Sequence, residues 1–389
     1  MEFSFTDEQQ MIRDTAEAFL AEVSTSEAVR AAMATESGYD PALWQRICAE
    51  MYWPAIHIPE AYGGMGLGYV ELVATLEQMG RVLLCSPFYS TVCLGVNALL
   101  VAGSEAQKNQ YLPQIIEGKT ATLAYTGVGG GWDAAAVEGN WRRDGDDFVL
   151  DGVWRYVPDG HTADLLIIAA REAGSEGEAG IGLFLVPADT EGVDREWLPT
   201  VDQTRKQAQL TLTDVRVPVA QLLESERSDV SGAAWPLLAR IIDLATIGVA
   251  AEQLGGCQQA LDSTVAYTRE RVQFNRTIAS FQAVKHKAAD MMVKVETARS
   301  AVYYAACVAQ QAMEGGPLGA ELSEAASIAK AWCSDAYFFN AGTGLQLHGG
   351  VGFTWEYDIQ LYFKRAKSSE TFLGNSAWHR ERIARQLLD

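Results

Sequence analysis

Two short basic runs interrupt a chain that is otherwise strongly acidic. They are Lys285-His286-Lys287 and Lys364-Arg365-Ala366-Lys367, in a sequence of 389 residues with 30 Lys and Arg against 50 Asp and Glu. Clustered basic side chains bind phosphate groups, so each run is a candidate contact for a phosphate-bearing ligand. A solvated helix face would give the same pattern. The net charge of −20 repels a nucleic-acid backbone, and we expect no nucleic-acid partner.

Cysteine and histidine usage argues against a metal centre. The six cysteines are scattered through predicted helices without a C-x-x-C pair, and none of the five histidines has a Cys or His at ligand spacing. This usage predicts reduced, buried thiols and no metal site. The first residues lack the basic and apolar regions of a signal peptide, and no apolar run reaches the roughly 18 residues of a membrane span. We therefore expect a soluble cytoplasmic protein.

The predicted secondary structure changes twice along the chain, from helices to strands and back to helices. Thr6 and Gln9 form the pattern of a capping box, and helical spacing continues on both sides of the glycine-rich loop 56–68. From about residue 121 the sequence has short apolar runs separated by Gly, Pro and Asp, which predict an antiparallel sheet or barrel. From about Ala233 it predicts helices again. The predicted strands include residues 148–150, 165–168, 182–186 and 210–212, and the predicted helices span 235–255, 257–270, 281–314 and 322–342, with a last one from Ala377.

This α, β, α order predicts an α+β protein of three domains. We expect an N-terminal helical domain over residues 1–120, a middle β domain over 121–226 and a C-terminal helical domain over 227–389. Strands do not alternate with helices, and no G-x-G-x-x-G opens a helix. A nicotinamide dehydrogenase is therefore disfavoured.

Six motifs resemble those of acyl-CoA dehydrogenases, in the family's order and across about 300 residues. They are Ile58-Pro59-Glu60-Ala61-Tyr62-Gly63-Gly64-Met65-Gly66-Leu67-Gly68, then the segment 103–113 with Gln107-Lys108 and Tyr111-Leu112-Pro113, then Asp214-Val215-Arg216-Val217-Pro218, then Arg271-Val272-Gln273-Phe274, then Phe281-Gln282-Ala283-Val284-Lys285-His286, and Gln346-Leu347-His348-Gly349-Gly350-Val351-Gly352. The resemblance runs from end to end and implies an acyl-CoA dehydrogenase-like fold with a C-terminal four-helix bundle.

The resemblance also implies a reaction and its partners. Such enzymes bind FAD between two subunits of a dimer of dimers. One subunit's β domain holds the isoalloxazine ring, and the other's bundle holds the pyrophosphate and adenosine. A carboxylate removes the α-proton of an acyl-CoA, hydride leaves to the flavin, and a trans-2-enoyl-CoA is formed. An electron-transfer flavoprotein then accepts the electrons.

The residues expected at the adenosine end are kept. The resemblance assigns the pyrophosphate to Arg271, whose guanidinium can donate two parallel hydrogen bonds, with an ion pair to Glu270 or Asp262 as the alternative. The other residues that it assigns to the cofactor could also be core aromatics, caps or plain loop residues. They are Phe274, Phe281, Gln282, Gln346, Gly349 and Gly350.

The residues expected at the flavin ring are altered. The family's T-E-P-x-A-G-S-D is here Thr126-Gly127-Val128-Gly129-Gly130-Gly131-Trp132-Asp133, in which Trp132 replaces a serine that would bind the pyrophosphate. The family's W-I-T is Tyr156-Val157-Pro158, so a hydroxyl near the flavin is replaced by proline, which also lacks an N–H. Thr126 and Tyr156 remain candidate ring contacts, and Tyr156 could also be a plain strand aromatic.

The catalytic base is also missing from its usual position. The frame of the family's Y-E-G-T places Leu373 there, and Ala245 stands at the alternative position on the first bundle helix. Neither side chain accepts a proton, so the catalytic residue is unknown. The nearby carboxylates Glu370, Glu252 and Asp243 could serve if one reached the substrate, but each could equally be solvated or ion-paired.

Four hypotheses follow. The first is the non-catalytic partner subunit of an α2β2 acyl-CoA dehydrogenase, of the kind known for actinobacterial enzymes of steroid side-chain β-oxidation. The second is a self-sufficient homotetramer with a relocated carboxylate. The third is a flavoprotein of the same fold with different chemistry, such as a desulfinase or a monooxygenase, and the fourth is a flavin-free scaffold. The asymmetry between a kept adenosine end and an altered ring end favours the first. The sequence does not identify the acyl group.

Overall fold

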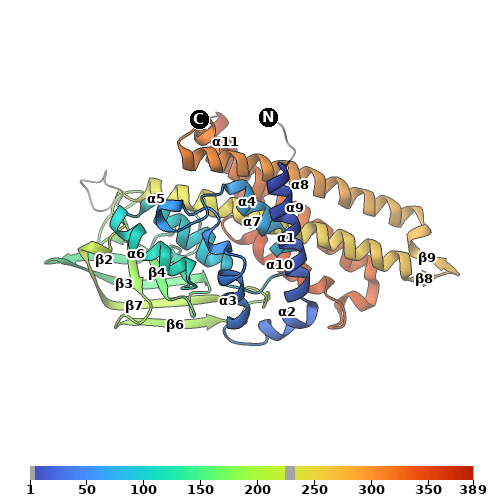
Figure 1. Ribbon diagram of the computed structural model, residues 1–389, viewed down its shortest axis with the longest axis horizontal. Coiled ribbons are helices and arrows are strands. Elements are labelled where there is room, and N and C mark those ends of the chain that lie inside the picture. Colours follow the sequence, from blue (N-terminus) through green and yellow to red (C-terminus); the bar gives the residue numbers. More distant parts are fainter. Residues whose placement is uncertain (1–4, 224–232, 389) are drawn as a thin grey trace. The chain divides into compact units, whose positions relative to one another are not determined.

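The computed structural model describes residues 5–223 and 233–388, and the chain divides into two compact units. The helical unit comprises Met1–Ala31, Gly68–Leu84 and Thr246–Asp389, and the sheet unit comprises Ala32–Leu67 and Cys85–Ala245. The expected limit between residues 226 and 227 lies outside the described residues. Helices come first, then strands, then helices, as the sequence predicts (Figure 1).

A seven-stranded sheet forms most of the sheet unit. Its order is β1-β4-β2-β3-β7-β6, with β5 paired to β4. All four runs that the sequence predicted to be strands lie in it. The pairs of β4 with β1 and with β2 are parallel, whereas the other pairings are antiparallel. The strands are β1 (Ala121–Ala124), β2 (Asn140–Asp144), β3 (Asp147–Pro158), β4 (Leu165–Glu172), β5 (Ile181–Pro187), β6 (Val193–Leu198) and β7 (Gln207–Pro218).

Large aromatic side chains fill the core of the sheet unit. Trp141, Phe148, Trp154 and Phe184 belong to one buried cluster. The two indole N–H groups donate to backbone carbonyls at 2.8 and 2.9 Å, so neither is buried without a partner. The helices of this unit are α3 (Pro41–Ala49), α5 (Asn97–Ala102) and α6 (Glu105–Ile116).

Long helices make up the helical unit (Figure 1). The capping box at Thr6 and Gln9 is confirmed at the start of α1. The prediction of separate helices over 235–255 and 257–270 was wrong, because α7 runs unbroken through Gly255 and Gly256. A further helix, α10, was not predicted. The helices are α1 (Asp7–Val23), α2 (Ser26–Met33), α4 (Tyr69–Arg81), α7 (Trp235–Glu270), α8 (Gln282–Glu314), α9 (Leu322–His348), α10 (Ile359–Thr371) and α11 (Ser376–Leu388), of which α2 and α7 continue into the other unit.

Gly255 of α7 and Gly80 of α4 lie where these two helices pack closely. A Cβ atom at Gly255 would lie 1.8 Å from the carbonyl oxygen of Glu77 in α4, and one at Gly80 would lie 2.1 Å from that of Glu252 in α7. The backbones of α4 and α7 therefore cross in direct contact. Packing therefore requires glycine at both positions, and Gly255 does not mark a break in α7.

A buried carboxylate joins three helices of the same unit. Glu77 of α4 is fully buried and accepts hydrogen bonds from Arg299 and Tyr303 of α8, while Arg13 of α1 lies 3.9 Å away. Burial raises the pKa of Tyr303, which keeps its hydroxyl a donor. A buried charge is tolerated because several donors satisfy it. None of the helices in the described ranges is long and apolar enough to cross a membrane.

The α4–α7 crossing gives a stability test. We expect Gly255→Ala to lower the free energy of unfolding by about 1–3 kcal/mol, because the added methyl group must push two backbones apart. The control is Gly342→Ala in α9, where a Cβ would lie 3.6 Å from Phe363, an ordinary contact. That change should leave stability equal or up to about 1 kcal/mol higher, since Ala favours helix. Urea unfolding of both variants measures this, and equal effects would contradict the account of the crossing.

Candidate functional site

A short hairpin carries the first group of candidate residues. Strands β8 (Val272–Gln273) and β9 (Arg276–Thr277) connect α7 to α8, and both residues of their turn have positive φ, 53° at Phe274 and 58° at Asn275. This left-handed turn exposes 84% of Phe274. Phe274 meets Phe281 edge to face at 6.1 Å between ring centroids. Phe274 is therefore an exposed aromatic that the turn projects, and Phe281 is partly buried, with the guanidinium of Arg276 4.0 Å from its ring centroid.

Arg271 and Gln282 lie at the two ends of this hairpin segment with their polar groups free. Both are exposed, and neither side chain makes a hydrogen bond or ion pair with any residue that the structure describes. The alternative in which Arg271 pairs with Glu270 or Asp262 is wrong, and Asp262 is instead bound by Arg81 at 3.0 Å. A guanidinium and an amide are thus available to a ligand.

The end of α9 supplies the second group. Gln346 accepts a hydrogen bond from the amino group of Lys287 at 3.0 Å, which leaves its NH₂ group without an acceptor in the described part of the chain. Gly349 has φ of 65°, which side chains disfavour, and a Cβ at Gly349 or Gly350 would meet no atom within 4 Å. The expected clearance beside the backbone is therefore present.

Stacked rings hold the ends of α7 and α9 together. Tyr267 lies on His348 with ring centroids 4.2 Å apart, and its hydroxyl donates to the His348 carbonyl at 3.2 Å. The His348 ring also contacts the Gly344 carbonyl at 2.7 Å, and burial lowers the pKa of His348, which favours the neutral ring. These contacts position the Gly349–Gly350 turn.

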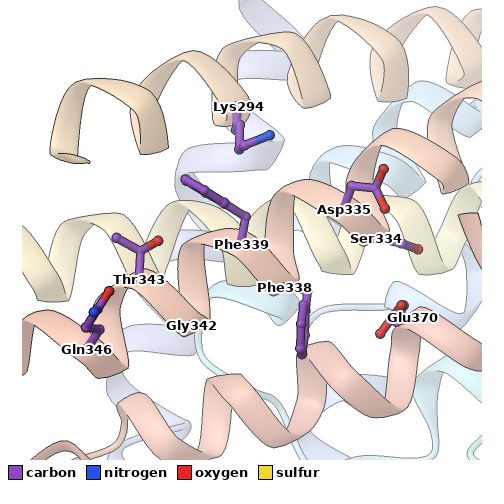
Figure 2. Close-up of a pocket in the computed structure, with 9 residues that line it drawn as sticks. All are labelled: Lys294, Ser334, Asp335, Phe338, Phe339, Gly342, Thr343, Gln346 and Glu370. Atoms are coloured by element: carbon purple, nitrogen blue, oxygen red, sulfur yellow. The ribbon is translucent and has the colours of Figure 1, made fainter. Parts of the chain in front are cut away.

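A pocket of about 530 Å³ opens along α9 next to these groups (Figure 2). Figure 2 shows Gln346 at one end of the pocket and Glu370 near the other, with Lys294 of α8 facing the ring of Phe339. The Lys294 amino group lies 4.7 Å from that ring's centroid. The pocket is lined by Lys294, Ser334, Asp335, Phe338, Phe339, Gly342, Thr343, Gln346 and Glu370.

The position of the missing base lies in the turn between α10 and α11. Leu373 is 1% exposed, has φ of 56°, and its carbonyl contacts the ring of His379 at 2.9 Å. Its side chain packs inside the protein. Glu370 is paired with Lys367 at 2.9 Å, and Ala245 is fully buried.

A buried lysine closes this turn. The amino group of Lys330, fully buried on α9, donates to the carbonyls of Glu370 at 3.1 Å and Gly374 at 2.9 Å and contacts Ser334 at 3.0 Å. Burial lowers the pKa of Lys330 to about 7. Sequence reasoning missed this residue, because nothing in an apolar helix segment shows that its lysine bonds to a turn 40 residues further on.

The ring-side candidates lie in the sheet unit. Thr126 donates its hydroxyl to the Arg155 carbonyl at 3.1 Å, which fixes the glycine-rich segment beside β3. Tyr156 sits at a bulge of β3 with φ of 57° and 51% exposure. Pro158 is buried, and its carbonyl accepts from Thr122 at 2.7 Å. This part of β3 therefore presents the exposed ring of Tyr156. Pro158 has no hydroxyl to offer where the family's motif has one.

The glycine-rich segment contains one contact that sequence reasoning also missed. The carboxylate of Glu138 accepts from the backbone N–H groups of Val128 and Gly129 at 2.9 and 2.8 Å. Trp132 is half-buried, with its ring 6.2 Å from that of Tyr125. No local pattern links Glu138 to amides nine and ten residues before it.

Models of the three domains of one family match the chain in order. They are the acyl-CoA dehydrogenase N-terminal domain over residues 6–119, the middle domain over 122–215 and the C-terminal domain over 234–388. The chain belongs to the acyl-CoA dehydrogenase family. The family, the fold and the reaction class expected from the sequence, acyl-CoA dehydrogenation by a flavoprotein oxidoreductase, are confirmed.

Individual acyl-CoA dehydrogenases match over nearly their full length. The chain is 32% identical over 370 residues to acyl-CoA dehydrogenase IpdE2 of Mycolicibacterium smegmatis, with 95% of each chain covered. It superposes on butyryl-CoA dehydrogenase from Megasphaera elsdenii with a TM-score of 0.90, 27% identity and 100% of both chains covered. It also superposes on a chain of the ChsE4–ChsE5 complex from Mycobacterium tuberculosis with a TM-score of 0.87, 27% identity, and 100% of this chain and 99% of that chain covered.

The buried amine predicts a pH dependence of stability. Between about pH 7 and 10 the unfolded chain keeps the Lys330 proton while the folded chain releases it, so this residue's contribution to the free energy of unfolding rises with pH. The stability of the unmodified chain relative to Lys330→Met should therefore rise by at most about 1.4 kcal/mol per pH unit. Urea unfolding of both proteins across this range measures the difference. A constant difference would show that Lys330 stays protonated in the fold.

Proposed function

We propose that this chain is the partner subunit of an α2β2 acyl-CoA dehydrogenase that forms a trans-2-enoyl-CoA. It supplies the adenosine and pyrophosphate contacts of FAD and lacks the catalytic base. The observation that carries the proposal is Leu373, a hydrocarbon side chain packed inside the protein where the resemblance places the base. The ChsE4–ChsE5 complex supports a two-chain assembly, because a relative that this chain matches over its full length belongs to it.

The described residues fit the adenosine end of FAD. Arg271 would hold the pyrophosphate through a forked, charge-assisted contact, Gln282 and Gln346 would donate amide hydrogens, and Phe274 with Phe281 would lie against the adenosine. The fit is supported by the free donors of Arg271 and Gln282 and by the open space at Gly350. FAD, when bound, supplies the acceptor of the hydride. We propose an electron-transfer flavoprotein as the acceptor of its electrons, as in the family.

The proton transfer is assigned to the partner chain. A general base must bring a lone pair within hydrogen-bonding distance of the proton that it removes. Leu373 and Ala245 have none to offer, and Glu370 is engaged with Lys367. The proline at 158 brings no hydroxyl to the strand that faces the flavin in the family. The same chain thus lacks both the base and the ring contact, and a homologous subunit with both would complete the site.

Removal of Arg271 tests the cofactor assignment. In the assembled complex, Arg271→Ala should weaken FAD binding roughly 10- to 100-fold, because a charge-assisted bond contributes about 1.5–3 kcal/mol. Arg271→Lys should be intermediate, since it keeps the charge but loses the fork. The control is Arg269→Ala, which removes another exposed charge from the same helix end. Equilibrium dialysis gives the dissociation constants, and equal values for Arg271→Ala and Arg269→Ala would exclude Arg271 from the site.

Activity assays test the division between subunits. The homogeneous chain should show no more than trace turnover of straight-chain or steroid acyl-CoAs with ferrocenium as acceptor, since loss of general-base catalysis costs on the order of 10²–10⁴-fold. Leu373→Glu should not restore activity, because Pro158 and Trp132 still alter the ring side. Co-expression with a homologue that has intact T-E-P-x-A-G-S-D and W-I-T motifs should give an active complex.

Turnover by the homogeneous chain would contradict the partner-subunit proposal. Rapid turnover by the homogeneous chain, abolished by Glu370→Gln, Glu252→Gln or Asp243→Asn, would identify a relocated base and overturn the partner-subunit proposal. The homologue purified alone is the control for activity that needs no second chain.

A further inference from the structure

A cluster of buried polar side chains lies beneath the turn between α10 and α11. The amino group of Lys330, a residue that is 0% exposed, has three acceptors within hydrogen-bonding distance. They are the Ser334 hydroxyl at 3.0 Å and the carbonyls of Glu370 at 3.1 Å and Gly374 at 2.9 Å. A protonated amine has three N–H groups and can serve all three acceptors, whereas a neutral amine has two N–H groups and one lone pair. The hydrogen bonds of Lys330 therefore depend on its protonation state.

Ser334 can adapt to either state because a second side chain lies behind it. Gln253 of α7 donates from Nε2 to the Ser334 hydroxyl at 3.2 Å and to the Ser369 hydroxyl at 3.1 Å, and Ser334 Oγ also lies 3.4 Å from Gln253 Oε1. A hydroxyl hydrogen rotates to suit its partners. Beside a charged amine the Ser334 hydrogen can point to Gln253, and beside a neutral amine it can point to the lone pair of Lys330. Both states can therefore keep the amine and the hydroxyl hydrogen-bonded.

Titratable and charged groups surround this amine on four helices. They are Cys333 and Asp335 of α9, Glu370 of α10, His379 and Arg382 of α11, and Cys257 of α7, which acts on Cys333. The two carboxylates are held in salt bridges. Burial raises the pKa of both thiols and lowers the pKa of His379 to about 3, so these three groups stay neutral near pH 7. Burial lowers the pKa of Lys330 to about 7, so the amine is the group of this cluster that changes charge there.

We propose that Lys330, Ser334 and Gln253 form a proton switch that controls how firmly the α10–α11 turn is held. The protonated amine donates to both turn carbonyls and to Ser334. When it loses its proton to water, the Ser334 hydroxyl reverses and donates to the amine. The bonds to the two carbonyls then weaken, because hydrogen bonds from a charged donor are stronger than those from a neutral one.

The switch extends to the surface of the helical unit. Ser334 and Glu370 also line the pocket along α9, at the end away from Gln346 (Figure 2). A change in the direction of the Ser334 hydroxyl therefore alters the polar lining of that pocket. The inference concerns the turn itself and does not rest on the assignment of the chain as a partner subunit.

A pH titration followed by NMR tests the switch. The buried amides of Leu373 and Gly374 lie between the two carbonyls and report on the turn. TROSY spectra of the deuterated, ¹⁵N-labelled full chain are recorded from about pH 6 to about pH 9. In the unmodified chain we expect both amide shifts to change in one transition with its midpoint at about pH 7. Lys330→Met should abolish the transition, and the control Lys285→Met, which removes an exposed lysine from α8 of the same unit, should keep it.

Ser334→Ala separates the switch from a general effect of pH. It leaves one N–H of the charged amine without its acceptor, and hydrogen bonds to charged groups contribute more to stability than neutral ones. The midpoint should therefore move to lower pH, by about half a unit to one unit. This variant decides the question if Lys330→Met does not fold. The proposal is overturned by the absence of a transition at both amides in the unmodified chain, by a transition that persists in Lys330→Met, or by a midpoint in Ser334→Ala that is unchanged or higher.

Discussion

The amino group of Lys330 fixes the turn on which the proposed function depends. From the buried side of α9 it donates to two carbonyls, of Glu370 and Gly374, that flank Leu373. His379 holds the carbonyl of Leu373 from the other direction. With the backbone held at both sides, the Leu373 side chain packs inward. These contacts hold the turn through its backbone, and the side chain at its centre can accept no proton.

The candidate cofactor contacts differ between the two units of the chain, although Leu373, at the position of the missing base, lies in the helical unit. The helical unit retains free donors at Arg271 and Gln282 and open backbone at Gly350. In the sheet unit, by contrast, Pro158 offers no hydroxyl and Glu138 occupies the amides of the glycine-rich loop. Random loss of function would not distinguish between the units. A difference of this kind supports the proposal that this chain shares a flavin with a partner subunit.

Much of the fold could be read from the sequence because its signals are local. The capping box at Thr6, the period of α8 and α9 and the apolar runs of the sheet depend on residues near one another in the chain. The break predicted between residues 255 and 257 was wrong. The reason for the glycine at 255 is the backbone of α4, about 180 residues earlier in the chain. The candidate site residues show the same difference between local signals and contacts formed only in the folded chain. Motif spacing predicted Arg271 and Gln346, whereas Glu138 and Lys330 act through contacts that only the folded chain brings together. The ion pair considered for Arg271 is absent, since its side chain pairs with no residue that the structure describes.

The most direct test of the central claim is the number of flavins per chain. The homogeneous protein and its complex with the homologous subunit would be purified in parallel, with flavin measured by absorbance and chains by amino-acid analysis. We expect one FAD per heterodimer in the complex and at most traces of FAD on the chain alone. One FAD per chain in the homogeneous protein would contradict it, because this chain's own middle domain would then hold the ring.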